Sequence, residues 1–259
     1  MAERDADDDT GTDDTGTTVR VPEVVTRIVS LVPSLTESVA ATVPHALVGA
    51  TDWCSHPADL DVTRVRGTKN PDLDAIRDLR PDVVLANAEE NREPDLAALR
   101  ATGVAVWVTR IETLDQAFVS LERMFRHACR ARPPAWLEEA REVWREPARG
   151  PRRTAIIPIW RRPWMVVGRD TFTGDVLRRL GVDNLYAGHP ERYPRVPLPE
   201  LAAKAPDLVV LPDEPYAFSA GDGPECFPGL RCALVSGRDL TWYGPSLVTA
   251  RDRLAGALA

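Results

Sequence analysis

Two stretches of the chain decide its fold: LDAIRDLRPDVVLA at Leu73–Ala86 and LPELAAKAPDLVVLP at Leu198–Pro212. In each stretch, apolar residues at helical spacing lead into a Pro-Asp pair, and an uninterrupted apolar run follows. A short helix before a buried strand is the repeating unit of a parallel sheet covered by helices on both faces. Pro81 and Pro206 lie 125 residues apart, which is the size of a lobe and not of a solenoid repeat.

The unit that precedes each of these stretches also recurs. The apolar run Arg27–Val32 leads to a helix that begins near Ser34, and Arg153–Ile159 leads to the helix Phe172–Leu180. A single match of a helix, a Pro-Asp pair and a strand could arise by chance. Two matched units in the same order favour duplication of a lobe. We therefore predict an α/β protein of two Rossmann-like lobes with parallel sheets, joined by a bridging helix, with a ligand cleft between the lobes.

The segment between the lobes has the pattern of helices. Thr113 and Gln116 form a capping box, and an apolar stripe at helical spacing runs from Leu114 to Ala128. A second helix of about 12 residues follows Pro133-Pro134, and Trp136 and Trp144 lie on its apolar face. The predicted organisation is a disordered acidic tail over residues 1–21, an N-terminal α/β lobe over 22–110, a helical bridge over 111–151 and a C-terminal α/β lobe over 152–259.

The charge of the chain is concentrated at its start. The formal net charge is −7, and residues 1–20 hold seven acidic residues against two arginines, which leaves about −2 for the rest. Without a basic surface the chain has nothing to neutralise phosphates, so nucleic acid is excluded as a partner. The acidic Asp/Thr/Gly segment has no aromatic residue, so we expect residues 1–20 to be disordered and dispensable for binding.

The chain shows no export or membrane signal. The start MAERDADDDT has neither a basic nor an apolar region, and no run of about 18 apolar residues follows. We expect a cytoplasmic protein as the sequence stands, and an extracytoplasmic one if a leader has been omitted. Cys54, Cys129, Cys226 and Cys232 lack the CxxC spacing of a zinc site. The last two form either a local disulfide or two thiols, and thiols are favoured without export.

Motifs of common enzymes are missing from the sequence. It has no GxSxG nucleophile turn, no GxGxxG or Walker loop and no HExxH helix, and its four histidines are scattered. We therefore expect a binding protein with no catalytic residue.

Five strings then carry a resemblance to a known family. RIVSLVPSLTE, VGATDWCSHP, PDLDAIRDLRPDVVLA, PWMVVGRDTFTGDVLRRLG and TWYGPSL occur in this order over nearly the whole chain after about Val25. Together they resemble the helical-backbone metal receptor superfamily, the substrate-binding proteins of cobalamin, haem and siderophore importers. The resemblance implies two Rossmann-like lobes joined by a stiff helix, with the ligand between them. The predicted bridge is shorter than the one usual in this family.

The resemblance also implies a function. It implies non-enzymatic binding of a metal chelate, either a cobalamin or other corrinoid or a ferric siderophore, for an ABC importer permease. Cobalt or iron would belong to the ligand, and the protein would have no cofactor of its own. Family members dock on the transporter through one acidic residue per lobe; Asp74 matches the first, whereas Pro199 stands at the second with Glu200 beside it. The alternatives are a cytoplasmic corrinoid- or siderophore-processing enzyme on this fold, or a degenerate receptor that acts as an interaction module.

Aromatic residues are the main candidates for ligand contact, because rigid rings hold a flat chelate at low entropic cost. They follow predicted strands, and ligands gather at the carboxyl ends of strands in open α/β sheets. The stretch around the first of them contributes a ligand-facing aromatic in the family. The candidates are Trp53, Trp160, Trp164, Trp242 and Tyr243. Trp107, within a strand, and the two bridge tryptophans are instead expected to be structural.

Three further residues complete the predicted site. His56 is a candidate ligand of cobalt or iron through a ring nitrogen, although a loop histidine in solvent is the commoner case. Arg161 is placed to pair with a carboxylate or phosphate of the ligand, or else is solvated. Tyr216 belongs to the segment Asp213–Tyr216, which follows a strand and is expected to shape the wall of the cleft.

Overall fold

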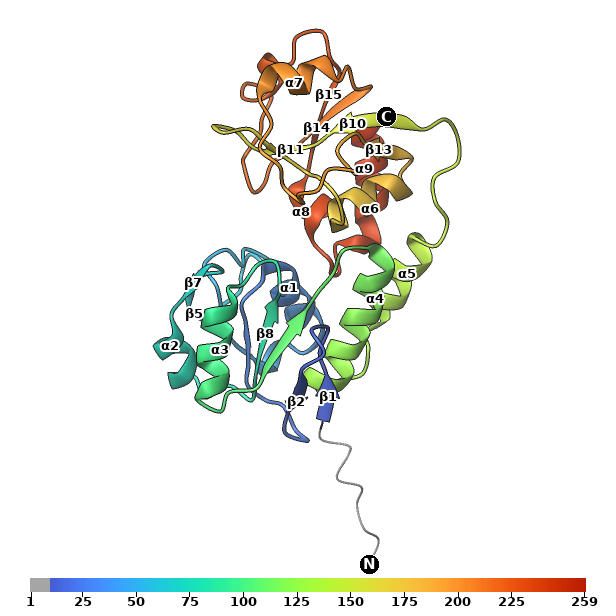
Figure 1. Ribbon diagram of the computed structural model, residues 1–259. Coiled ribbons are helices and arrows are strands. Elements are labelled where there is room, and N and C mark those ends of the chain that lie inside the picture. The colour runs from blue at the N-terminus through green and yellow to red at the C-terminus, as the bar shows by residue number, and fades with distance from the viewer. Residues whose placement is uncertain (1–9) are drawn as a thin grey trace, which may run out of the picture. The chain divides into compact units, whose positions relative to one another are not determined.

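A computed structural model describes residues 10–259, which form two compact units, each with its own parallel sheet (Figure 1). The first unit takes in the chain as far as Arg110 and the segment Phe118–Leu137. The second unit takes in Ile111–Ala117 and Glu138–Ala259. The predicted α/β fold with two parallel sheets is confirmed, because within the described residues no strand of one sheet pairs with the other.

The sheet of the first unit has five parallel strands in the order β5-β4-β3-β8-β9. They are Thr63–Arg64 (β5), Leu47–Ala50 (β4), Ile28–Ser30 (β3), Val83–Asn87 (β8) and Val106–Thr109 (β9). The other elements are α1 (Pro33–Thr42), η1 (Pro44–Ala46), the hairpin β6 (Arg66–Gly67) and β7 (Asn70–Pro71), α2 (Leu73–Asp78) and α3 (Glu93–Ala101). The apolar runs of the sequence therefore form the central strands.

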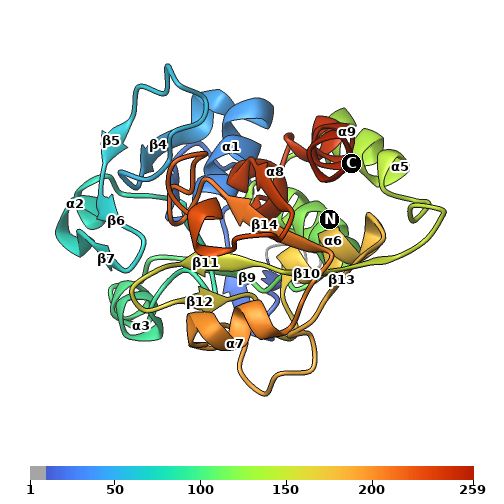
Figure 2. The ribbon, with the colours of Figure 1, turned by 90° about the horizontal axis from the view of Figure 1, so that it is seen from above.

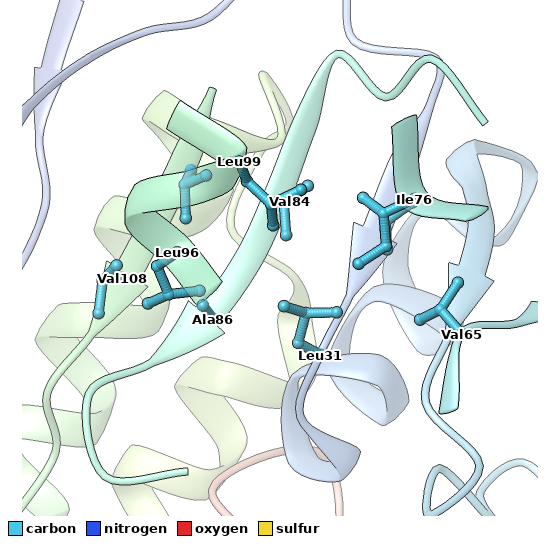
Figure 3. Packing of buried hydrophobic residues seen from close by; sticks show 10 residues of the cluster. Leu31, Val65, Ile76, Val84, Ala86, Leu96, Leu99 and Val108 are labelled. Carbon is cyan, nitrogen blue, oxygen red and sulfur yellow. The ribbon is translucent and has the colours of Figure 1, made fainter. Parts of the chain in front are cut away.

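Helices α2 and α3 pack on one face of this sheet and make a core there (Figure 3). Ile76 of α2 and Leu96 and Leu99 of α3 pack in one cluster with Val84 and Ala86 of β8, and each is at most 1% exposed. Full burial of a large apolar side chain contributes about 2 kcal/mol. Residues two apart on β8 face this core, as the alternation of side chains in a strand requires.

The sheet of the second unit has four parallel strands in the order β13-β10-β14-β15. They are Val182–Asn184 (β13), Arg153–Ile156 (β10), Leu208–Pro212 (β14) and Cys232–Val235 (β15). Figure 2 shows β10 beside β13, and the hairpin of β11 (Pro158–Trp160) and β12 (Met165–Val166). The helices are α6 (Phe172–Arg179), α7 (Leu198–Ala203), η3 (Pro224–Cys226), α8 (Gly237–Thr241) and α9 (Leu247–Leu258).

The repeated Pro-Asp pairs have the same structural role in the two units. The carboxylate of Asp82 accepts hydrogen bonds from the backbone N–H groups of Thr26 (2.8 Å) and Arg27 (2.9 Å), just before β3. The carboxylate of Asp207 accepts them from the N–H (2.7 Å) and hydroxyl (2.8 Å) of Thr154 in β10. These bonds hold the pKa of Asp207 below its ordinary value. Each aspartate thus ties its own strand to the neighbouring strand, which gives the repeat a physical reason.

The helices between the lobes of the sequence are α4 (Leu114–Arg123), which continues as the π-helical turn η2 (Met124–Ala128), and α5 (Ala135–Val143). The Thr113 hydroxyl accepts from Gln116 N–H (3.1 Å), and the Gln116 side chain accepts from Glu112 N–H (2.8 Å). Every member of the expected apolar stripe is buried: Leu114, Ala117, Phe118, Leu121, Met124, Phe125 and Ala128. The chain passes between the two units three times, after Arg110, within α4 and within α5.

The expectation of a disordered acidic tail is wrong for residues 10–21. Strands β1 (Thr10–Thr12) and β2 (Thr18–Arg20) form a hairpin, while residues 1–9 lie outside the described residues. Asp13, at 2% exposure, accepts from Val108 N–H of β9 (3.2 Å). Asp14 accepts from Arg110 N–H (2.9 Å) and Arg123 Nη1 (3.1 Å), and Ser120 Oγ donates to it as well. The edge strand β9 and helix α4 supply the donors that turn these carboxylates into anchors.

We expect Asp14→Asn to lower the free energy of unfolding by about 2 kcal/mol, because charge-assisted hydrogen bonds to backbone and arginine are lost together. Urea denaturation followed by circular dichroism measures the change. Asp59→Asn, which replaces an exposed aspartate of the same unit, is the matched control. Deletion of residues 1–20 should destabilise the protein in the same way, and a truncated chain as stable as the parent would contradict the anchoring role.

Within residues 10–259, none of the helices combines the length and the apolar character needed to cross a membrane.

Candidate ligand-binding site

In the first unit, the predicted site residue Trp53 follows the carboxyl end of β4 and is 68% exposed. Its indole lies against the β6–β7 hairpin: a Cβ added to Gly67 would lie 3.2 Å from Trp53 Nε1 and 2.5 Å from Asn70 Oδ1. A side chain at position 67 would therefore displace the Asn70 amide and press on the edge of the indole. The glycine and the neighbouring amide support an aromatic face that stays open to solvent.

Hydrogen bonds hold this hairpin to the loop after β8. The Lys69 ammonium donates to the Glu89 carbonyl (2.5 Å), and the Asn91 side-chain amide donates to the Thr68 carbonyl (3.0 Å). In the same loop, burial raises the pKa of Glu90 and the nearby Lys69 charge opposes the shift. Trp53 thus belongs to a surface built by three loops at the carboxyl edge of the sheet, where ligands gather in open α/β folds.

His56 is half-buried in the same β4–β5 segment. Its Nδ1 lies 3.1 Å from the Ser55 hydroxyl. In the part of the chain that the structure describes, no three His, Cys, Asp or Glu side chains are grouped so that they could hold a metal ion. Contact of His56 with a ligand's metal stays a prediction. The cysteines Cys54, Cys129, Cys226 and Cys232 are thiols in the structure, not disulfides.

In the second unit, the structure brings four of the predicted residues together. Trp160 of β11 is 42% exposed and meets Tyr216 edge to face, with ring centroids 5.6 Å apart and an angle of 82°. Trp164 lies parallel to Phe218 at 6.1 Å and edge-on to Phe227 at 5.4 Å. Trp164 and Tyr216 are both partly buried and pack against the core of the unit, and Trp160 is the more exposed ring of the Trp160–Tyr216 surface.

The fourth of these residues, Arg161, is held by carboxylates of the protein itself. Its side chain is 11% exposed, and Nη1 donates to Glu225 (2.8 Å) and to Asp222. Asp222 also accepts from the Tyr216 hydroxyl (2.6 Å). These contacts lower the pKa of Glu225 to about 2, chiefly through the hydrogen bond from Arg161, and raise the pKa of Arg161. The expected pairing of Arg161 with an anion of the ligand would have to compete with both carboxylates.

Trp242 and Tyr243 are placed differently. They follow α8, and each is only 7% exposed. Tyr243 packs edge-on against Phe172 of α6 (5.6 Å), and the Arg238 guanidinium lies 5.9 Å from the Trp242 ring centroid. The structure thus groups them with helices α6 and α8 rather than with the Trp160 surface, and their contact with ligand stays a prediction.

The two predicted docking acids lie in the first turns of matching helices. Asp74 of α2 is 80% exposed and pairs with Arg77. Glu200 of α7 is exposed and lies 3.5 Å from the Tyr186 hydroxyl. Burial, together with the Glu200 carboxylate, raises the pKa of Tyr186 to about 12. Docking stays a prediction, and both carboxylates are open to solvent as it requires.

Sequence reasoning missed the residues that support these surfaces. Asp222 lies in a polar, Gly-containing loop and Glu225 in the short helix η3, and they pair with Arg161 across 61 and 64 residues. Lys69 and Asn91 likewise act over 20 or more residues. The spacing of residues in the sequence does not reveal these pairs, because the fold brings the two partners together. The Trp-Arg-Arg run at Trp160 was the one sequence feature that indicated a site here.

The depressed pKa of Glu225 gives a pH test. Because its folded pKa of about 2 lies below the ordinary glutamate value of about 4.3, its pairing stabilises the fold above that value and is lost as pH falls through about 2. We expect a carbon-13 titration of the Glu225 carboxyl to have its midpoint near 2 in the parent protein and near 4 in Arg161→Gln. A parent midpoint near 4 would mean that the ion pair does not form in solution.

No protein-family model matches the chain. Among curated proteins, it is 23% identical over 249 residues to the vitamin B12-binding protein of Pectobacterium carotovorum subsp. carotovorum, which covers 90% of this chain and 88% of that protein. It is 22% identical over 201 residues to the vitamin B12-binding protein of Vibrio cholerae, covering 74% and 72%.

Solved structures share the fold. The periplasmic vitamin B12-binding protein BtuF of Vibrio cholerae matches with a TM-score of 0.74 at 20% identity, over 90% of this chain and 96% of that one. A periplasmic heme-binding protein from Pseudomonas aeruginosa matches with a TM-score of 0.76 at 24% identity, over 90% and 92%.

The two parallel-sheet units give the molecule the two-lobed α/β fold of these solved binding proteins. The chain is thus similar to vitamin B12-binding and heme-binding proteins, which confirms the resemblance stated from the sequence.

The expectation of a cytoplasmic location is wrong. The similar vitamin B12- and heme-binding structures are periplasmic proteins by name, and this finding contradicts the cytoplasmic expectation. The expectation depended on the absence of an apolar leader in MAERDADDDT. Similarity to relatives over most of the chain is stronger evidence than this short segment.

Proposed function

We propose that this protein binds a metal chelate reversibly, as the substrate-binding protein of an ABC importer. The observation that carries the proposal is the Trp160–Tyr216 surface, two part-exposed rings that meet edge to face in the second unit. Trp53 offers a second open ring on the first unit. Rings of this kind hold a large flat ligand with little loss of side-chain entropy. The vitamin B12- and heme-binding relatives support the same class of ligand.

The ligand we propose is a cobalamin or other corrinoid, with a ferric siderophore as the other candidate. Its cobalt or iron is cargo and arrives already coordinated, so the protein needs no metal site of its own. His56 is the one predicted residue that offers an imidazole to such a metal. The importer permease is the proposed macromolecular partner, and Asp74 and Glu200 are the proposed contacts, since both carboxylates are exposed.

The second candidate function is an enzyme that processes the bound chelate. Binding and processing are separated by the fate of the ligand. The protein is incubated with cyanocobalamin or a ferric siderophore, the complex is isolated, and the released ligand is analysed by mass spectrometry. We expect the ligand to be recovered unchanged after many hours. A stoichiometric or catalytic change in its mass would contradict the non-enzymatic proposal.

A further inference from the structure

Arg161 lies where the two arms of an aromatic cluster meet in the second unit. One arm is the β11–β12 hairpin with Trp160 and Trp164, and the other is the loop after β14 with Tyr216 and Phe218. We call these four rings the aromatic cluster. They are more than 50 residues apart in sequence between the arms, so their geometry depends on contacts that join hairpin and loop.

Besides the ring contacts themselves, the guanidinium of Arg161 supplies polar contacts of this kind. It donates to Glu225 and Asp222 of the loop, and its Nη2 lies 3.3 Å from the Cys226 sulfur. Its Cζ lies 5.3 Å from the centroid of the Trp164 ring, within the range of a cation–π interaction. Asp222 in turn binds the Tyr216 hydroxyl. One side chain thus connects both arms, directly through Trp164 and through a carboxylate to Tyr216.

We infer that Arg161 is a positioning residue, which fixes the Trp160–Tyr216 surface for ligand and does not itself contact an anionic group of the ligand. This inference rests on the proposed function. One guanidinium between two carboxylates gives the group a net charge of −1, and the arginine is 11% exposed while Asp222 and Glu225 are 42% and 50% exposed. An approaching anion therefore meets the carboxylates before it meets the cation.

Two probes separate positioning from direct contact: dicyanocobinamide, which has neither a net charge nor a phosphate, and haemin, which carries propionates. We expect Arg161→Gln to weaken both to a similar extent, by about tenfold. The pair of changes Asp222→Asn and Glu225→Gln should weaken both probes as well, because the arms separate. If Arg161 instead contacted an anion, removing its two competitors would strengthen haemin binding, and Arg161→Gln would affect haemin alone. That pattern would overturn the inference.

A measurement without ligand tests the positioning itself. Labelling with 5-fluorotryptophan gives each of the seven tryptophans a fluorine signal, and single Trp→Phe variants assign them. We expect Arg161→Gln to shift or broaden the signals of Trp160 and Trp164 and to leave that of Trp107 unchanged. Arg161→Lys, which keeps the charge but not the planar fork, should recover part of the effect. Unchanged signals of Trp160 and Trp164 in Arg161→Gln would contradict the inference.

The matched control is Arg152→Gln, which breaks another arginine–carboxylate pair of the same unit, with Asp183 (2.7 Å from Nε). It should leave probe affinity and the fluorine signals of the aromatic cluster unchanged. If the parent protein bound neither probe and no ferric siderophore while Arg161→Gln still shifted Trp160 and Trp164, the proposed function would fail and the positioning role would stand. Urea denaturation of each variant separates a local change from loss of the fold.

Discussion

Replacing Trp107 with alanine should lower the free energy of unfolding of the first unit by about 4 kcal/mol. The indole is fully buried in β9 and stacks on the His127 ring of η2, with centroids 6.3 Å apart and an angle of 12°. The backbone of Gly11 in β1 approaches so closely that an added Cβ would lie 2.9 Å from the ring. Alanine would leave a cavity between strand, π-helical turn and hairpin, which the packed surroundings cannot close.

Urea denaturation followed by circular dichroism measures this loss, and Trp53→Ala is the control. Trp53 is 68% exposed, so its removal should change stability by less than about 0.5 kcal/mol. Trp107→Phe keeps most of the ring and should lie between the two. If Trp107→Ala were no less stable than Trp53→Ala, the packing of β9 against the hairpin would be wrong.

The largest expected effect on binding is that of Trp160→Ala. If the Trp160–Tyr216 surface is a central anchor, loss of the exposed indole should cost about 2 kcal/mol, or about thirtyfold in affinity for the best ligand. The fold should survive, because Trp164 and not Trp160 fills the core with Phe218 and Phe227. Fluorescence titration and circular dichroism on the same samples give the two quantities.

A variant of the buried pair provides the comparison. Trp242 and Tyr243 are each 7% exposed, so Trp242→Ala should lower stability, in contrast to Trp160→Ala. Trp53→Ala should behave like Trp160→Ala and weaken binding in a folded protein. If folded Trp53→Ala and Trp160→Ala variants both kept the affinity of the parent, the open aromatic surfaces would not be the ligand site, and the likeness to binding proteins would concern the fold alone.

The repeated sequence units predicted the fold well because their periodicity is set by local physics. An apolar run such as Val83–Asn87 must be buried on both faces, and a helix before it supplies the cover. The stripe from Leu114 to Ala128 was equally readable, since residues three and four apart share a helix face. The hairpin of residues 10–20 could not be predicted, because Asp13 and Asp14 anchor it only through N–H groups that Val108 and Arg110 donate in the folded protein.

The site was predictable in residue type and not in arrangement. Loop tryptophans after strands indicated an aromatic site, and Trp53 and Trp160 are open to solvent as such a site requires. The partial burial of Trp164 could not be predicted from the sequence, because the rings that cover it, Phe218 and Phe227, lie more than 50 residues away. The same holds for Arg161, whose charge looked available in sequence and is neutralised by two carboxylates in the fold.

One titration tests directly whether the protein binds a metal chelate. The full chain is titrated with cyanocobalamin, cobinamide, haemin and a set of ferric siderophores, and tryptophan fluorescence reports binding. The proposed function predicts that at least one corrinoid or siderophore quenches the fluorescence to saturation at one ligand per chain, with a Kd of about 1 μM or tighter, and less so in Trp160→Ala. Unchanged fluorescence and no retention of any of these ligands on dialysis would contradict it.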